Sequence, residues 1–222
     1  MASQSKGTTK DDIIRALLNA SFSRSAGSTS MSDVASYLNM KKASLYNHIS
    51  GRDQLVSQTV DSCADYIRQI TFIPGDYESV CKKYSAQTVL KGITERYFKI
   101  HEKDPLFQIY TFIESQKYFD EKAASIVLEE EKVLEQQISL VFTSLADENK
   151  LSLTSQKIPG AVRWFCMGLR TLLSDWLLER KKIVMENPVS GEGELFALPQ
   201  DEGISQKVDS FVAEFISIIQ SS

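Results

Sequence analysis

The sequence has few of the residues that build metal centres and catalytic sites. Its 222 residues include two histidines and three cysteines, and no cysteines form a CxxC pair. This predicts neither a zinc site nor a disulfide framework. Buried free thiols are the simpler interpretation of Cys63, Cys81 and Cys166, with a redox role as the alternative. A glycine-rich phosphate loop and a nucleophile elbow are also missing. We therefore expect no enzyme, no metal and no cofactor.

Long apolar segments are missing as well. The sequence contains no run of about 18 apolar residues, so it predicts no membrane span. Residues 1–9 lack the basic start and the apolar stretch of a signal peptide. With 42% hydrophobic and 24% charged residues, the chain has the composition of an ordinary globular protein that can bury a sizeable core. We expect a cytoplasmic protein with no membrane partner.

Charge is distributed unevenly along the chain, although the net value of −4 is small. Residues 1–52 contain seven basic and three acidic residues and carry +4, which leaves −8 on the other 170 residues. The basic residues of this segment are Lys6, Lys10, Arg15, Arg24, Lys41, Lys42 and Arg52. This asymmetry is typical of a module that meets phosphates joined to one that does not.

Apolar residues recur every three to four positions through most of the chain, a pattern that predicts an all-α protein of about nine helices. Thr9 with Asp12, and Ser30 with Asp33, resemble capping boxes at two helix starts, and Gly27 is expected to end the first helix. The later helices are expected at about residues 31–38, 41–49, 52–74, 78–103, 105–118, 120–146, 157–185 and 204–220. The segment between Glu186 and Gly203 should be an extended loop.

The first three helices have the layout of a helix-turn-helix DNA reader. Such a unit needs a small residue where its last two helices cross, as Ala35 is, and a turn residue that accepts positive φ, as Asn39 does. It also needs apolar contacts between these helices and a polar, cationic outer face. The apolar set is Val34, Leu38, Met40 and Leu45, and the outer set is Lys41, Lys42, Ser44 and Asn47. Periodicity alone leaves DNA binding open, because helical hairpins also occur in proteins that bind no DNA.

These residues resemble the DNA-binding region of the tetracycline-repressor (TetR) family. That family has an Ile/Val-Ala pair on the second helix, a Leu-Tyr-x-His-Phe ending on the third, and a Lys-Glu/Asp-x-Leu start to the fourth. The matching segments here are Val34-Ala35, Leu45-Tyr46-Asn47-His48-Ile49 and Arg52-Asp53-Gln54-Leu55. Asn39 replaces the usual glycine of the turn. Lys41 replaces a common capping serine, which removes a cap worth about 1 kcal/mol.

The resemblance implies a TetR-type helix-turn-helix domain at 7–67, with its motif at about 30–49, and a helical ligand-binding and dimerisation domain at 68–222. It places Lys42, Ala43 and Tyr46 at base edges, where a lysine favours guanine and an alanine methyl can meet thymine. Further DNA-contacting or supporting positions are Ser30, Ser32, Lys41, Ser44, Asn47, His48 and Arg52, with Arg52 at a phosphate. As alternatives, Tyr46 could pack between helices, His48 could support the scaffold, and the lysines could be solvated surface.

In the resembled family the last two long helices form a dimer interface, and the larger domain encloses a ligand pocket. The corresponding segments here each have an apolar stripe, and Gly168 permits close helix approach. The residues expected at the interface are Phe165, Leu169, Leu172, Trp176, Phe211 and Phe215. Those expected around an apolar effector are Tyr97, Phe107, Tyr110, Phe112, Trp164 and Phe165. Packing in the core of one chain is the alternative for both sets.

The sequence thus predicts a sequence-specific DNA-binding transcriptional regulator of bacterial type. We expect a homodimer on a palindromic double-stranded operator, and a repressor that an unidentified small-molecule effector releases. The alternative is a DNA-binding-deficient interaction or ligand-binding protein of the same fold.

Overall fold

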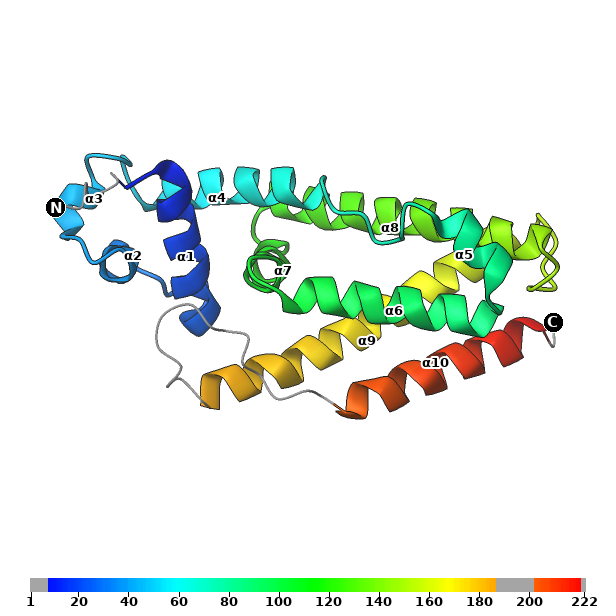
Figure 1. The fold of residues 1–222 in the computed structure, drawn as a ribbon. Coiled ribbons are helices and arrows are strands. Elements are labelled where there is room, and N and C mark those ends of the chain that lie inside the picture. The colour runs from blue at the N-terminus through cyan, green and yellow to red at the C-terminus, as the bar shows by residue number, and fades with distance from the viewer. Residues whose placement is uncertain (1–7, 187–201, 221–222) are drawn as a thin grey trace, which may run out of the picture. The chain divides into compact units, whose positions relative to one another are not determined.

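The computed structural model describes residues 8–186 and 202–220, and every regular element in this part of the chain is an α-helix (Figure 1). The helices are α1 (Lys10–Arg24), α2 (Met31–Tyr37), α3 (Lys42–Leu45), α4 (Arg52–Ile67), α5 (Tyr77–Lys83), α6 (Ala86–Glu102), α7 (Leu106–Gln116), α8 (Glu121–Asp147), α9 (Ile158–Glu186) and α10 (Glu202–Gln220). The all-α fold class is confirmed. The loop expected between Glu186 and Gly203 falls on residues 187–201, which lie outside the described part.

The ten described helices exceed the expected nine because the segment 78–103 holds two helices instead of one. Tyr84 and Ser85 have extended backbone, with ψ values of 160° and 157°. The Ser85 hydroxyl accepts the backbone N–H of Thr88 at 3.2 Å and so caps the start of α6. A capping serine in an apolar periodic segment therefore interrupts a helix that periodicity alone predicts as continuous.

The helices group into two compact units that interleave along the chain. The first unit comprises the chain up to Ile70 together with Pro105–Leu128, and the second comprises Thr71–Asp104 and the chain from Glu129 onward. The boundary expected near residue 67 separates a DNA-binding part from a part that binds ligand and dimerises, and it stays a prediction.

In the first unit, α1 is the central helix and packs against α2, α4 and α7. Its buried face includes Ile13 and Leu17, each 1% exposed, and the Phe22 ring meets Phe107 of α7 edge to face at 4.9 Å. Both expected capping boxes are confirmed: Thr9 and Asp12 exchange hydrogen bonds at the start of α1, and Ser30 and Asp33 do so at the start of α2.

The end of α1 differs from the expectation that Gly27 would stop it. The helix ends at Arg24, and Ser25 follows with φ 93° and ψ 152°, a region that is populated mainly by glycine. A non-glycine residue pays about 1–3 kcal/mol for such backbone. The surrounding hydrogen bonds therefore have to hold this connection in place.

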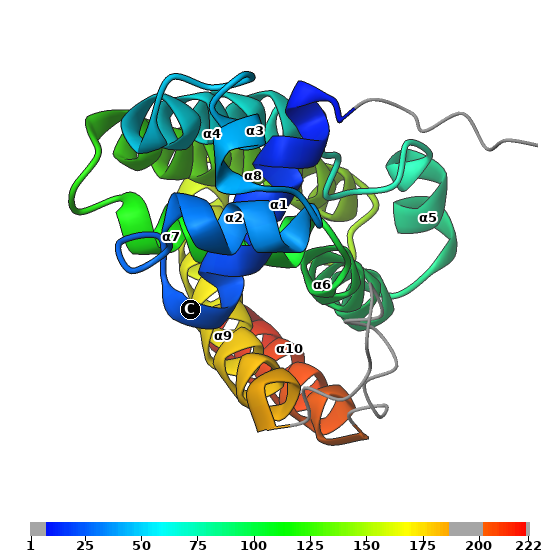
Figure 2. The ribbon, with the colours of Figure 1, turned by 90° about the vertical axis from the view of Figure 1, so that its left-hand side faces the viewer.

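In the second unit, α10 packs against α6 and α9, and Figures 1 and 2 both show α9 and α10 side by side. Phe165 and Phe215 meet edge to face at 5.1 Å in the core between these two helices. The expected close approach at Gly168 is confirmed, because a Cβ there would lie 2.5 Å from the Phe211 ring. An ion pair joins the buried Arg180 of α9 to the half-buried Glu102 of α6 at 2.6 Å.

The three cysteines are free and buried, as the simpler interpretation held. Burial raises the pKa of the Cys63 and Cys166 thiols to about 12, and it also raises the pKa of Cys81. Because the thiolate is the reactive form, these side chains act as small core residues at neutral pH.

Candidate nucleic-acid interface

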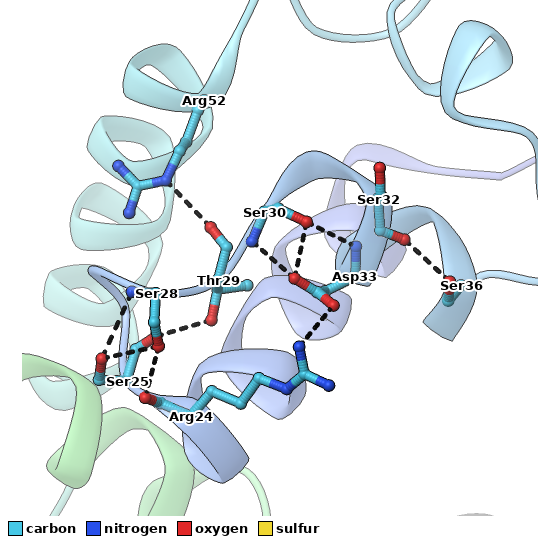
Figure 3. Close-up of polar contacts among 9 residues, drawn as sticks. All are labelled: Arg24, Ser25, Ser28, Thr29, Ser30, Ser32, Asp33, Ser36 and Arg52. Carbon is cyan, nitrogen blue, oxygen red and sulfur yellow. Dashed lines mark hydrogen bonds and ion pairs between the residues drawn. The ribbon is translucent and has the colours of Figure 1, made fainter.

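The start of α2 is held by the Ser30–Asp33 capping box. The Asp33 carboxylate accepts the backbone N–H of Ser30 at 2.8 Å and its hydroxyl at 2.7 Å. These two hydrogen bonds, helped by the nearby Arg24 guanidinium, lower the pKa of the Asp33 carboxyl below its usual value. Ser30 and Ser32 are exposed, but the Ser30 hydroxyl is already engaged in the cap. The cap therefore fixes where α2 begins (Figure 3).

The turn between α2 and α3 has the predicted conformation. Asn39 has φ 50°, in the left-handed region that asparagine tolerates. The backbone N–H of Met40 donates to the Ala35 carbonyl at 3.0 Å, which closes the turn over the buried Ala35. The turn therefore directs the chain from α2 into α3 without a glycine.

The third helix is shorter than expected and covers Lys42–Leu45, while residues 46–48 form a turn. Lys41 precedes it without a side-chain cap, as the replacement of the common serine predicts. Of the four α3 residues, all of them described, Leu45 is the buried one at 0% exposure. The short helix therefore depends on Leu45 for its attachment to the unit.

The outer side of this segment is open to solvent. Its exposed residues, which we call the reading face, are Lys41, Lys42, Ala43, Tyr46, Asn47 and His48, and Ser44 at its edge is half-buried. Tyr46 is 45% exposed and so is not packed between helices. The segment thus presents two cations, an aromatic ring and polar groups on one exposed stretch, which is the character that duplex DNA requires of a reader.

The structure gives Arg52, expected at a phosphate, partners within the protein. Its Nε donates to the Thr29 carbonyl at 3.0 Å (Figure 3). Its Nη2 donates to the carbonyls of Ala26 and, at 3.4 Å, Gly27. Its Nη1 lies 4.0 Å from the exposed Asp53 carboxylate. The sequence motif identified this arginine, but it did not predict the carbonyl acceptors, because they belong to a connection more than 20 residues away.

The residues expected around an effector lie in separate surroundings. Tyr97 packs on His101 with ring centroids 4.3 Å apart, Phe107 on Phe22, and Phe165 among other phenylalanines. The remaining three are Phe112, which is buried, Tyr110, which is half-buried, and Trp164, which is 53% exposed. Phe107, Tyr110 and Phe112 belong to the first unit and the other three to the second. Their role in binding an effector stays a prediction.

Most residues expected at the dimer interface are buried inside one chain. Phe165, Leu169, Trp176 and Phe215 are at most 5% exposed, whereas Leu172 and Phe211 are half-buried. These four side chains contribute to the core of a single protomer, and their part in a dimer interface stays a prediction. Other apolar side chains of α9 and α10 face solvent.

The exposed apolar side chains of α9 and α10 form a second surface that the sequence reasoning missed. Trp164, Met167 and Leu178 of α9 are 53%, 59% and 65% exposed, and Ile218 of α10 is 46% exposed. Trp164, Met167 and Ile218 also line an open groove of about 700 Å³ between the two helices. We call these four residues the α9–α10 face. An exposed apolar surface of this kind is typical of a protein–protein interface.

Two further features are absent from the described residues. They contain no group of three or more His, Cys, Asp or Glu side chains that could hold a metal ion. Within the same ranges, no helix is both long and apolar enough to cross a membrane.

Known proteins that are similar to this chain include transcriptional regulators. No protein-family model matches the chain. IcaR of Staphylococcus aureus, the HTH-type negative transcriptional regulator of the biofilm operon icaADBC, is 24% identical over 170 residues, which cover 77% of this chain and 83% of IcaR.

Solved structures align over nearly the whole chain. A transcriptional regulator from Mesorhizobium loti assigned to the TetR family has a TM-score of 0.57 and 17% identity, over 94% of this chain and 95% of that one. A TetR transcription regulator from Haloarcula marismortui has a TM-score of 0.55 and 10% identity, over 95% and 97% of the two chains. These alignments confirm the resemblance that residues 30–55 indicate: the chain has the fold of the TetR-family transcriptional regulators.

Proposed function

We propose that this protein is a sequence-specific DNA-binding transcriptional regulator that reads duplex DNA with the reading face. The observation that carries the proposal is the solvent exposure of Lys41, Lys42 and Tyr46 on a segment held from beneath by Leu45. The +4 charge of residues 1–52 suits an approach to phosphates. We expect the protein to be cytoplasmic and its partner to be double-stranded DNA.

Within this proposal each residue type has a distinct role. Lys42 donates hydrogen bonds to guanine in the major groove, and the Ala43 methyl meets thymine. Tyr46 contributes a further base contact, whereas Lys41, Asn47 and His48 contact the DNA backbone. Smaller backbone contributions come from Ser30, Ser32 and Ser44. Residues 7–67 form the DNA-binding part and residues 68–222 the part that dimerises and senses an effector.

The test of the proposal is selection of a duplex from a random pool by the wild-type protein, followed by titration of that duplex with Lys42→Ala. Losing one base-contacting lysine costs about 1–3 kcal/mol, so we expect binding to weaken roughly 5- to 150-fold for each half-site, with relaxed base preference at one position of each half-site. Fluorescence anisotropy with matched and single-mismatch duplexes measures both effects.

A matched control for the loss of one exposed lysine is Lys99→Ala on α6, which should bind the selected duplex as the wild type does. Wild-type binding should also weaken steeply with salt. If the wild type enriches no sequence and binds no duplex, the chain is instead a DNA-binding-deficient protein of the same fold.

The proposal includes a homodimer formed through the α9–α10 face. One helix-turn-helix reads only a few base pairs, whereas two of them, about 34–36 Å apart or a multiple of that, read a palindrome. The exposed Trp164, Met167, Leu178 and Ile218 provide an apolar area that a second copy would cover. Leu172 and Phe211, both half-buried, line the groove beside it.

We further infer that the regulator is a repressor that an effector releases from its operator. The relative IcaR is named a negative regulator, which favours repression. An effector acts only through its different affinities for the DNA-binding and the released states. A difference of about 3 kcal/mol would change operator affinity by more than 100-fold.

We infer that the side-chain amide of Gln108 on α7 forms hydrogen bonds with the effector. Its side chain is 1% exposed, and within the described part of the chain neither its Oε1 nor its Nε2 atom has a hydrogen-bond partner. A buried polar group without a partner costs about 1–3 kcal/mol. A bound molecule with a hydrogen-bonding group would remove this cost, next to the expected Phe107 and Phe112.

Gln108→Leu is therefore expected to stabilise the ligand-free protein by about 1–3 kcal/mol, because it removes the unpartnered amide at nearly the same volume. Urea unfolding at equilibrium measures the change. Gln116→Leu, at a half-buried position of the same helix, serves as the control and should change stability by less than about 0.5 kcal/mol. A Gln108→Leu protein less stable than the wild type would show that the amide is satisfied in solution.

A further inference from the structure

Arg52 is the first residue of α4, and its side chain is directed at the connection between α1 and α2 rather than at solvent. Two of its nitrogens donate to three carbonyls of that connection, those of Ala26, Gly27 and Thr29. Figure 3 shows the bond to Thr29. Its side chain is 37% exposed. The donors that a phosphate would need are therefore largely engaged within the protein.

The connection that receives these bonds is itself cross-linked. The Ser28 hydroxyl donates to the Arg24 carbonyl at 2.6 Å, and the Thr29 hydroxyl donates to the Ser25 carbonyl at 2.7 Å. Thr29 is only 2% exposed, and Ser25 is held with positive φ. The residue after Thr29 is Ser30, the cap of α2. A constraint on Thr29 is thus a constraint on the first turn of α2.

We propose that Arg52 is a positioning residue: it fastens the start of α4 to the α1–α2 connection and so sets where α2 and the reading face stand relative to α4. This inference rests on the proposed function, because the reading face has a role only if the protein reads DNA. A guanidinium suits the task because its planar fork sends N–H groups in fixed directions toward several acceptors. A lysine ammonium is a point charge that cannot reproduce that arrangement.

The two roles of Arg52 predict different binding to DNA. A phosphate-binding residue is partly replaced by lysine, and its loss lowers the slope of log affinity against log salt concentration by about 0.9 for each phosphate contact removed. A positioning residue is not replaced by lysine, because charge is not what it contributes. Its loss misplaces the reading face and leaves the salt slope unchanged.

The first experiment titrates Arg52→Lys and Arg52→Ala with the duplex that the wild type enriches from a random pool, and with an unrelated duplex. We expect both variants to bind the enriched duplex at least 10-fold more weakly, with the wild-type salt slope and wild-type affinity for the unrelated duplex. Arg68→Lys, the same change just after the other end of α4, should bind both duplexes normally. Recovery of affinity in Arg52→Lys, or a shallower slope in Arg52→Ala, would overturn the proposal.

The second experiment needs no DNA. Amide hydrogen exchange is measured for residues 29–33, where the capping box protects the Ser30 and Asp33 amides. In Arg52→Lys these amides should exchange at least 10-fold faster than in the wild type, while Arg68→Lys leaves them unchanged. Unchanged exchange in Arg52→Lys overturns the positioning role. If the wild type enriches no duplex, the proposed function fails, and the exchange rates still decide whether Arg52 anchors the connection.

Discussion

The Met167→Glu variant is expected to be a monomer in solution, whereas the wild type is expected to be a dimer. Met167 is 59% exposed on the α9–α10 face, close to Trp164 along the same helix. Burying an unpaired carboxylate against an apolar partner surface costs several kcal/mol, and a two-fold interface contains the change twice. We therefore expect the dissociation constant of the dimer to rise by at least 100-fold, by about 3 kcal/mol or more.

Light scattering coupled to size-exclusion chromatography distinguishes a chain of 25.0 kDa from a pair. Affinity for a palindromic duplex should fall with the loss of the dimer, because a monomer reads one half-site. Leu128→Glu is the matched control, since Leu128 is 64% exposed on α8 and gains the same charge without being one of the four residues of this face. A Met167→Glu protein that stays dimeric would exclude the α9–α10 face as the interface.

Leu45→Ala should have a large effect on both the stability of the first unit and DNA binding by the reading face. Leu45 is 0% exposed, and it is the buried residue of a helix that has only four residues. Truncating a fully buried leucine costs about 2–5 kcal/mol, which combines lost apolar burial with the cavity left behind. We expect α3 to lose its fixed position and binding to the enriched duplex to disappear.

Chemical denaturation followed by circular dichroism gives the loss of stability, and anisotropy gives the loss of binding. Leu45→Met keeps most of the volume and should cost less than about 1.5 kcal/mol, with DNA binding retained. The role that we assign to Leu45 would be wrong if Leu45→Ala unfolded at the wild-type denaturant concentration and bound the duplex normally.

Local chemistry made several features of the fold predictable. The Ser30–Asp33 capping box forms between residues three positions apart, and Asn39 takes positive φ because its own side chain tolerates it. The break between α5 and α6 was missed although it is also local. Ser85 caps α6 by the same chemistry, but the apolar periodicity around it predicted one continuous helix. Where the deciding contact lies within a few residues, the sequence contains the information.

The face that a helix buries was predictable, but what covers that face was not. The stripe containing Phe165, Leu169 and Phe215 is apolar for the core of its own chain, while Trp164 and Met167 beside it stay exposed. A helical period of 3.6 residues records that a side is apolar and says nothing of whether the partner is the same chain or another. Which apolar residues of α9 and α10 are buried and which stay exposed could therefore be known only from the packing of α9 against α6 and α10.

By itself, the sequence determined that this chain is all-α, with a helix-turn-helix near its N-terminus and a cationic third helix, because periodicity, caps and turn residues act over short stretches. Only the tertiary structure decided that Arg52 donates to carbonyls more than 20 residues earlier, and that Leu45 points inward while Tyr46 stays in solvent. Those outcomes depend on which distant backbone and side-chain groups the folded chain brings within a few ångströms, and no local pattern encodes that distance.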